Sequence, residues 1–133
     1  IRGGDYLDEK NKQIFGGICT IDYYRSAIEY FSTILKNPHF FVFSNDKQYV
    51  LKNFKMKNCT FIDWNNGRDS YKDMYLMSRC KYNIIANSTF SWWASWLNPN
   101  PNRIIIVPQR FNNLHGNIKS TNWPKGYIQL DSY

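Results

Sequence analysis

Short apolar runs that alternate with amphipathic segments constrain the fold of this chain more than any other feature. Residues 22–36 repeat apolar side chains at helical spacing, and residues 39–43 then form a continuous apolar run, typical of a strand buried on both faces. The complete pattern predicts helix 22–36, strand 39–43, helix 46–54, strand 59–62, helix 69–81, strand 82–86, helix 91–97 and strand 103–107. This alternation predicts one α/β domain with a mostly parallel sheet flanked by helices.

The charge balance favours an anionic partner. Seventeen Lys and Arg against ten Asp and Glu give a net charge of +7, which suits phosphates, nucleic acid or an acidic membrane surface. Most aromatic residues fall at core-like positions, whereas a platform for stacking bases needs exposed aromatics, so we expect no nucleic-acid partner. No apolar run reaches the ~20 residues of a membrane span. Because Ile1 and Arg2 resemble the end of a strand, we expect further sequence upstream.

The cysteines and histidines do not form a metal-binding pattern. Cys19, Cys59 and Cys80 are odd in number and widely spaced, which indicates reduced thiols in a cytosolic protein rather than a disulfide framework. His39 and His115 stand alone, and the chain has no Cys-x-x-Cys. We therefore expect no structural metal.

Residues that follow the strands are the candidates for function, because ligands of open parallel sheets collect beyond the carboxyl ends of the strands. Arg2 offers a planar fork for a phosphate beside two glycines that allow close backbone approach, and a plain turn with a surface arginine is the alternative. Asp46 follows strand 39–43 and is a candidate to bind a ribose or a base. A helix cap is its alternative role.

The most specific candidate site lies between strand 82–86 and helix 91–97. Free backbone N–H groups and the helix dipole favour a phosphate at such a helix N-terminus. A capping turn needs one small polar residue, whereas this segment supplies several. The candidate binding residues here are Asn87, Ser88, Thr89 and Ser91.

The aromatic residues of the same helix have a different expected role. Trp92 and Trp96, like Trp93 and Leu97, are spaced four residues apart and lie on common helix faces. We expect these side chains to pack in the core.

At this segment the sequence resembles a known family. Residues 84–98 resemble the signature block of the alpha-1,2-fucosyltransferases, glycosyltransferase family eleven. Residues 69–74 and 77–80 are similar to the family's acidic segment and its Met-Ser-x-Cys. Residues 2–6 resemble the end of His-x-Arg-Arg-Gly-Asp-Tyr, and residues 43–46 resemble Ser-Asp-Asp.

Two positions depart from these motifs. Gly3 replaces the second arginine of the first motif, and Asn45 replaces the first aspartate of Ser-Asp-Asp, so neither position inherits a role. The first arginine is retained as Arg2. The resemblance implies a Rossmann-like domain that forms one half of a GT-B glycosyltransferase, with residues 1–133 as a single GDP-sugar-binding domain and an acceptor-side domain upstream.

The resemblance also implies the reaction. The expected activity is inverting transfer of fucose from GDP-fucose to the 2-hydroxyl of a galactose-terminated glycan, as in a galactoside alpha-1,2-fucosyltransferase, without a metal or other cofactor. We expect a cytoplasmic location, with peripheral association at the inner face of the membrane left open, and no activity from this chain alone. The alternatives are a domain for another sugar nucleotide and a basic domain that binds nucleic acid or membrane without catalysis.

Roles within the site follow from the resemblance and from residue chemistry. Arg2 and the N–H groups around Ser91, together with the Ser88 and Thr89 hydroxyls, are expected to hold the diphosphate as charge builds on it.

Two carboxylates complete the expected site. Asp73 is the candidate for guanine or ribose, and a helix-face carboxylate near Lys72 is its alternative. Asp5 is the candidate general base, and a base from the upstream domain is equally open.

Overall fold

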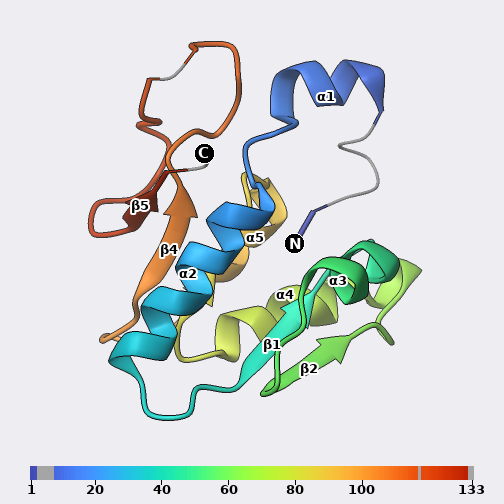
Figure 1. The fold of residues 1–133 in the computed structure, drawn as a ribbon, viewed down its shortest axis with the longest axis vertical. Helices are drawn as coiled ribbons and strands as arrows, with labels where there is room; N and C mark the ends of the chain where they lie inside the picture. Colours follow the sequence, from blue (N-terminus) through green and yellow to red (C-terminus); the bar gives the residue numbers. More distant parts are fainter. Residues whose placement is uncertain (3–7, 117, 132–133) are drawn as a thin grey trace.

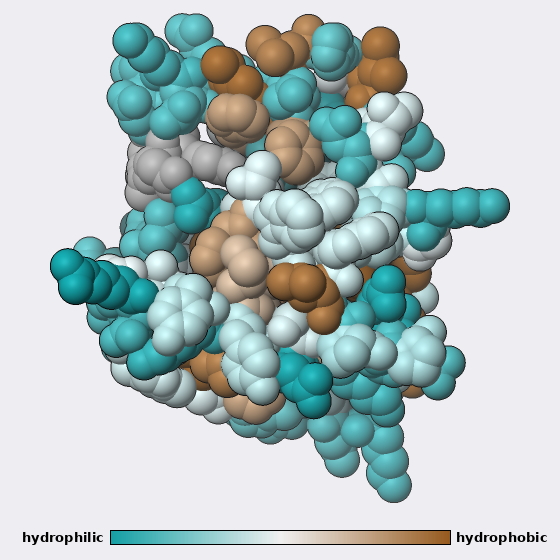
Figure 2. Space-filling view, turned by 180° about the vertical axis from the view of Figure 1, so that it is seen from behind, coloured by the Kyte–Doolittle hydropathy of each residue, from teal (hydrophilic) through white to brown (hydrophobic). Residues whose placement is uncertain are grey.

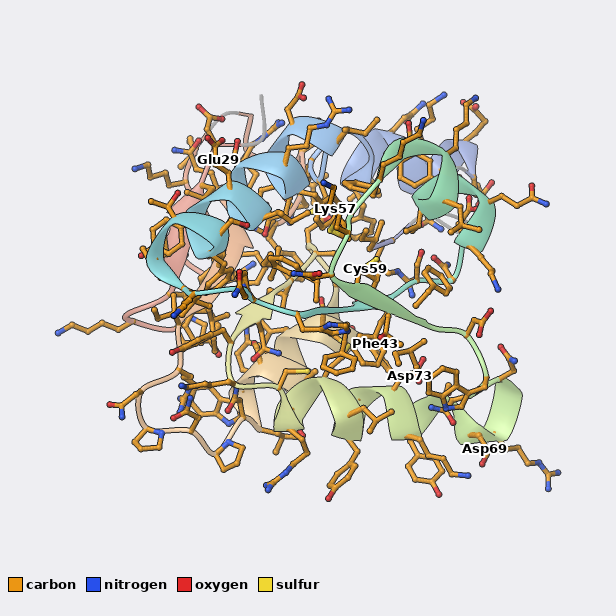
Figure 3. The ribbon with its side chains drawn as sticks, turned by 60° about the horizontal axis from the view of Figure 1, so that its bottom comes forward. Glu29, Phe43, Lys57, Cys59, Asp69 and Asp73 are labelled. Carbon is orange, nitrogen blue, oxygen red and sulfur yellow. The ribbon has the colours of Figure 1, made fainter. Side chains whose placement is uncertain are left out.

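The computed structural model describes residues 1, 2, 8–116 and 118–131. Its strands lie between two layers of helices, with α2 and α3 on one side and α4 and α5 on the other (Figures 1 and 3). The elements follow the order α1 (Glu9–Phe15), α2 (Ile21–Ile34), β1 (Phe40–Phe43), α3 (Lys47–Asn53), β2 (Cys59–Ile62), a 3-10 turn η2 (Gly67–Asp69), α4 (Ser70–Arg79), β3 (Asn83–Ile84), α5 (Thr89–Trp96), β4 (Ile105–Pro108) and β5 (Ile128–Leu130).

Every strand pairing in the described part of the chain is parallel. The strands form two groups, one with the order β1-β2 and one with the order β3-β4-β5. Phe40 lies opposite Cys59 in the first group, and Asn83 lies opposite Ile105 in the second. The parallel pairing and the flanking helices confirm the predicted α/β class.

The sequence pattern located every helix and strand that it predicted, with shifted ends. The structure shortens strand 82–86 to Asn83–Ile84 and begins α5 at Thr89 rather than at residue 91. One α-helix and one strand of the described residues, α1 and β5, were not predicted. Helix α1 buries none of its residues, so it has no apolar stripe to detect, and β5 has only three residues.

The longest helix, α2, has 14 residues. No helix among the described residues is long and apolar enough to span a bilayer.

Helix α2 forms the centre of the larger core cluster. Its buried side chains Tyr23, Tyr24 and Phe31 pack in one cluster with Val42 of β1 and Ile106 of β4. The hydroxyl of Tyr23 donates hydrogen bonds to the carbonyl oxygens of Ile85 at 2.7 Å and Ile106 at 3.3 Å. One helix residue therefore fixes α2 to β4 and to the carboxyl end of β3.

The prediction that the tryptophans of α5 lie in the core is wrong for most of them. Trp93 is 50% exposed, Trp96 is 49% exposed and Leu97 is 55% exposed, while Trp92 is half-buried and stacks on Trp96. The face opposite α2, seen in Figure 2, accordingly shows pale aromatic and brown apolar side chains among hydrophilic ones.

Small residues explain this orientation. The buried side chains of α5 are Ser91, Ala94 and Ser95, which share one helix face. Their small size lets the helix backbone approach the strands closely, so the large rings lie on the other faces.

The Tyr23 hydrogen bonds generate a stability prediction. Replacing Tyr23 with Phe keeps the ring but removes the buried donor, and we expect the free energy of unfolding to fall by about 1–3 kcal/mol. Chemical denaturation measures this change. The matched control is Tyr75→Phe, which removes the hydroxyl of a residue that is 64% exposed, with an expected change within about 0.5 kcal/mol. Equal stability of the two variants would contradict a stabilising role for the Tyr23 hydroxyl.

Candidate functional site

A pocket of about 340 Å³ opens where the chain leaves β1, β2 and β3. Phe43 and Ala86 contribute to its walls, and Ile1 lies at its edge. Its polar lining residues are Arg2, Ser44, Asn45, Asn65, Asn66, Ser70, Asp73, Ser88 and Ser91. The pocket thus lies at the carboxyl ends of parallel strands, as expected for ligands of this class of fold.

The N-terminus of α5 forms one wall of this pocket. Ser88 is the N-cap residue and its side chain caps no backbone N–H. The first intrahelical hydrogen bond runs from the Trp92 N–H to the Ser88 carbonyl at 2.9 Å. The N–H groups of residues 89–91 precede that bond, so they are available to an anion at the positive end of the helix dipole.

Ser91 fixes the turn that leads into α5. Its hydroxyl lies within hydrogen-bonding distance of two carbonyl oxygens, that of Ala86 at 3.0 Å and that of Ser88 at 3.1 Å. Both contacts are buried. The Ser91 hydroxyl is therefore occupied within the turn, and the predicted phosphate contact through the backbone N–H groups around Ser91 does not compete with these contacts.

Arg2 lies at the junction of two cavities. It lines the 340 Å³ pocket together with Ser88 and Ser91. It also lines a neighbouring cavity of about 240 Å³ that contains Asp46 and Asn87. The structure therefore brings Arg2 beside the α5 N-terminus, the arrangement that a phosphate site needs.

Asp73 lines the pocket wall formed by α4. Figure 3 shows this residue on the side of α4 that faces the strands, near Phe43, whereas Asp69 lies at the outer end of the helix. The Asn65 side-chain amide donates to the Asp73 Oδ1 at 2.7 Å, and Lys72 pairs with Asp69 at 2.8 Å. The partner of Asp73 is therefore a pocket residue and not the neighbouring lysine.

Asp46 has the geometry of its alternative role. Its carboxylate accepts a hydrogen bond from the Tyr49 N–H at 3.0 Å and caps α3. The Ser44 hydroxyl accepts one from the Asp46 N–H at 3.0 Å. Asp46 also lines the smaller neighbouring cavity. Its contact with a ribose or base stays a prediction, and its carboxylate already serves as the cap of α3.

Asn87 connects three segments that are distant in the sequence. Its amide nitrogen donates to the carbonyl oxygens of Phe15 and Phe111, each at 3.1 Å, and its amide oxygen accepts from the Cys19 thiol at 3.3 Å. These bonds favour a structural role over the predicted substrate contact. Thr89 is exposed on the first turn of α5, away from the lining of the larger pocket.

Asp5, the candidate general base, lies outside the described residues. The predicted role therefore remains untested by the geometry.

Asn65, Asn66 and Ser70 line the pocket and were not among the sequence-predicted site residues. Asn65 follows β2 by three residues, so the rule applied after the other strands would have identified it.

The titratable groups near the pocket include one inert thiol. Burial raises the pKa of Cys19 to about 11, which keeps the thiol protonated near neutral pH. The described residues contain no group of three or more His, Cys, Asp or Glu side chains placed to hold a metal ion.

Comparison with known proteins identifies the family. Residues 1–129 match Glycosyl transferase family 11. The chain is 37% identical over 132 residues to the O-antigen biosynthesis glycosyltransferase WbnK of Escherichia coli, covering 98% of this chain and 43% of that protein. It is 39% identical over 110 residues to an alpha-1,2-colitosyltransferase of the same organism, covering 81% of this chain and 38% of the relative.

A mammalian protein shows a weaker similarity. Galactoside alpha-(1,2)-fucosyltransferase 1 of Rattus norvegicus is 29% identical over 99 residues, covering 73% of this chain and 26% of its own length. No solved structure matches the chain. The chain spans less than half the length of each of these relatives. The family match extends over nearly the whole sequence, and the chain belongs to glycosyl transferase family 11.

Proposed function

We propose that this chain binds GDP-fucose and forms the donor side of an inverting galactoside alpha-1,2-fucosyltransferase. The observation that supports this most directly is the pocket that Arg2, the N-terminus of α5 and Asp73 all line. Arg2 and the α5 N-terminus suit a diphosphate, and Asp73 offers a carboxylate to a base. The fucosyltransferase and colitosyltransferase relatives share the alpha-1,2 linkage in their names.

The diphosphate lies between Arg2 and the first turn of α5 in this proposal. The N–H groups of the first α5 turn, the Ser88 side chain and the Arg2 guanidinium are the groups that bind it. Negative charge grows on the diphosphate as the glycosidic bond breaks, and fixed donors stabilise that charge without reorganising. The sequence has no Asp-x-Asp metal motif, so these groups supply the positive charge.

Asp73 binds the guanine base or the ribose. Asn65 donates a hydrogen bond to one Asp73 carboxylate oxygen, and both residues line the pocket. A carboxylate accepts hydrogen bonds from the N1 and N2 donors of guanine, which uracil does not have in that arrangement. This contact therefore favours GDP over UDP.

The acceptor and its deprotonation involve other residues. Asp5, or a carboxylate of an acceptor-side domain, removes the proton from the galactose 2-hydroxyl. Such a domain, which we propose lies upstream, also holds the acceptor beside the donor. The chain alone is then expected to bind the donor and transfer no sugar.

The alpha-1,2-colitosyltransferase relative supports a second candidate, transfer of a colitosyl group through the same pocket. The two candidates share the diphosphate contacts and differ only around the sugar. Competition between the two donors in a binding assay distinguishes them.

Donor binding gives the first test of the proposal. We expect GDP to bind this chain more tightly than UDP, and to bind equally well with EDTA or with added magnesium. Asp73→Asn should weaken GDP binding about tenfold or more, because it removes a charged hydrogen-bond acceptor. Titration calorimetry measures both effects.

The control for Asp73 is Asp69→Asn, which removes a carboxylate at the outer end of the same helix and should leave GDP affinity unchanged. An absolute need for a divalent metal, or equal effects of the two substitutions, would contradict this placement of the donor.

Arg2 gives the second test, in a transferase that contains both domains. Arg2→Ala should lower the turnover rate on the order of a hundredfold, and lower donor affinity less, because the contact strengthens in the transition state. Arg2→Lys should restore only part of the rate, since an ammonium lacks the planar fork. Steady-state kinetics with GDP-fucose and a galactoside acceptor measure both parameters.

Arg25 provides the matched control. It is exposed on α2 and pairs with Asp22 at 3.4 Å, away from the pocket lining, so Arg25→Ala should retain normal rates. Near-normal turnover of Arg2→Ala would remove Arg2 from the mechanism and leave the diphosphate to α5 alone.

A further inference from the structure

Helices α4 and α5 expose large aromatic and apolar side chains on the face that points away from the strands (Figure 2). Tyr71 and Tyr75 lie on one side of α4 and are mostly exposed. Trp93, Trp96 and Leu97 of α5 are each about half exposed. We call these five side chains the α4–α5 face. Large apolar groups that gather on a protein surface mark a binding site for a partner.

The two helices present these side chains as one continuous surface. Helix α4 packs directly against α5. Ser70 and Ser88, at the N-terminal ends of the two helices, line the same pocket. At the C-terminal ends, the Asn98 side-chain amide donates to the Cys80 carbonyl at 2.9 Å. The helices therefore run side by side in the same direction, with their exposed rings on the same outer side.

Basic side chains flank the α4–α5 face. Five of them are exposed: Arg68, Lys72, Arg79, Lys81 and Arg103. The Arg103 guanidinium donates to the Asn98 carbonyl at 3.2 Å, which places it at the C-terminal end of α5. Within residues 67–104, all of which the structure describes, the exposed acidic residue is Asp69, and it pairs with Lys72. The surface is therefore basic as well as aromatic, and its charge is complementary to an anionic partner.

We infer that the α4–α5 face docks on the surface of an anionic lipid bilayer. Trp and Tyr favour the boundary between the acyl chains and water, because their rings are apolar and their N–H or O–H groups are polar. Leu97 adds apolar area that the acyl chains cover, and the flanking Lys and Arg side chains meet the anionic headgroups. Both helices then lie in the plane of the interface.

Two other partners fit this surface less well. Single-stranded nucleic acid needs free ring faces on which bases stack. The Trp92 and Trp96 rings stack on each other with centroids 5.4 Å apart, which occupies one face of each, and Leu97 offers no ring. A second copy of the chain would bring two basic surfaces together across a two-fold axis, where like charges repel. A lipid surface satisfies both the rings and the charges.

The α4–α5 face extends to the proposed donor pocket. Ser70 lines that pocket, and Tyr71 of the face follows it directly. A docked chain therefore holds the donor pocket beside the bilayer, a consequence that rests on the proposed function. Vesicle binding is measured without GDP, so the docking surface and the donor site fail separately.

Sedimentation of this chain with lipid vesicles tests the inference. We expect vesicles of phosphatidylcholine with about 30% phosphatidylglycerol to bind the chain on the order of tenfold more tightly than vesicles of phosphatidylcholine alone. Replacing Trp93 and Trp96 together with Ser should weaken binding to the anionic vesicles on the order of tenfold or more, because it removes the buried apolar area. Arg79→Gln with Lys81→Gln should weaken that binding roughly tenfold.

The matched control lies on α3, in the opposite helix layer. Leu51 is 58% exposed there and Lys52 follows it, so Leu51→Ser with Lys52→Gln removes one apolar side chain and one charge from the wrong face. We expect this variant to bind the vesicles as the unchanged chain does. Thermal unfolding verifies that each variant is folded, and the Arg79 and Lys81 variant alters exposed side chains alone.

Three results would overturn the inference. The first is equal binding to the two kinds of vesicle, or an equal loss of binding in the α3 control. The second is binding of a thymidine oligonucleotide that weakens when Trp93 and Trp96 are replaced, which would show a nucleic-acid partner. The third is a dimeric mass that becomes monomeric in the same variant, which would show that a second copy covers the face.

Discussion

The turn between β3 and α5 is the constraint on which the site depends, because it fixes the N-terminus of α5 at the carboxyl edge of the strands. The Ser91 hydroxyl lies within 3.1 Å of the carbonyls of Ala86 and Ser88, and Asn87 binds the carbonyls of Phe15 and Phe111. These side chains fix the turn, and the backbone N–H groups that precede the first intrahelical bond of α5 are available to an anion. Asn87 and Ser91, which the sequence suggested as ligand contacts, thus hold in place the backbone groups that can bind an anion.

The same turn explains how the donor is held without an acidic metal site in the proposed mechanism. Helix α5 contributes a fixed partial positive charge, and Arg2 contributes a full one on the same pocket. Asp73 of α4 lines the same pocket and accepts a hydrogen bond from Asn65. In the proposed mechanism the positive groups bind the phosphates, and Asp73 accepts hydrogen bonds from the donors of guanine.

Most of the fold could be predicted from the sequence, because apolar periodicity distinguishes buried strands from amphipathic helices. That periodicity failed for α5, where Ser91, Ala94 and Ser95 face the core and the large rings of Trp93 and Trp96 are exposed. We expected the large apolar side chains to mark the buried face of this helix. In a short helix that packs closely on strands, the small side chains mark that face instead. Helix α1 and strand β5 were missed for a related reason, since neither has a long apolar repeat.

The site was predicted more coarsely than the fold. The rule that ligands lie beyond strand ends singled out Arg2 and Ser88, and the resemblance singled out Asp73; all three line one pocket. The rule could not distinguish residues that contact a ligand from residues that hold the turn in place. The hydrogen-bond partners that give Asn87 its structural role, Phe15 and Phe111, lie 72 and 24 residues away in the sequence. Such contacts become visible only when the chain is folded.

The most direct test of the account is to map backbone amide shifts by NMR as GDP is added to this chain. The account predicts that the largest changes occur at the lining residues Ser88, Phe90, Ser91, Asn65 and Asp73 of the pocket at the N-terminus of α5. The chain offers a second basic hollow, lined by Arg25, Lys52 and Lys55, where a diphosphate could bind by charge alone. Shifts gathered at that hollow, with residues 88–91 unchanged, would contradict the account.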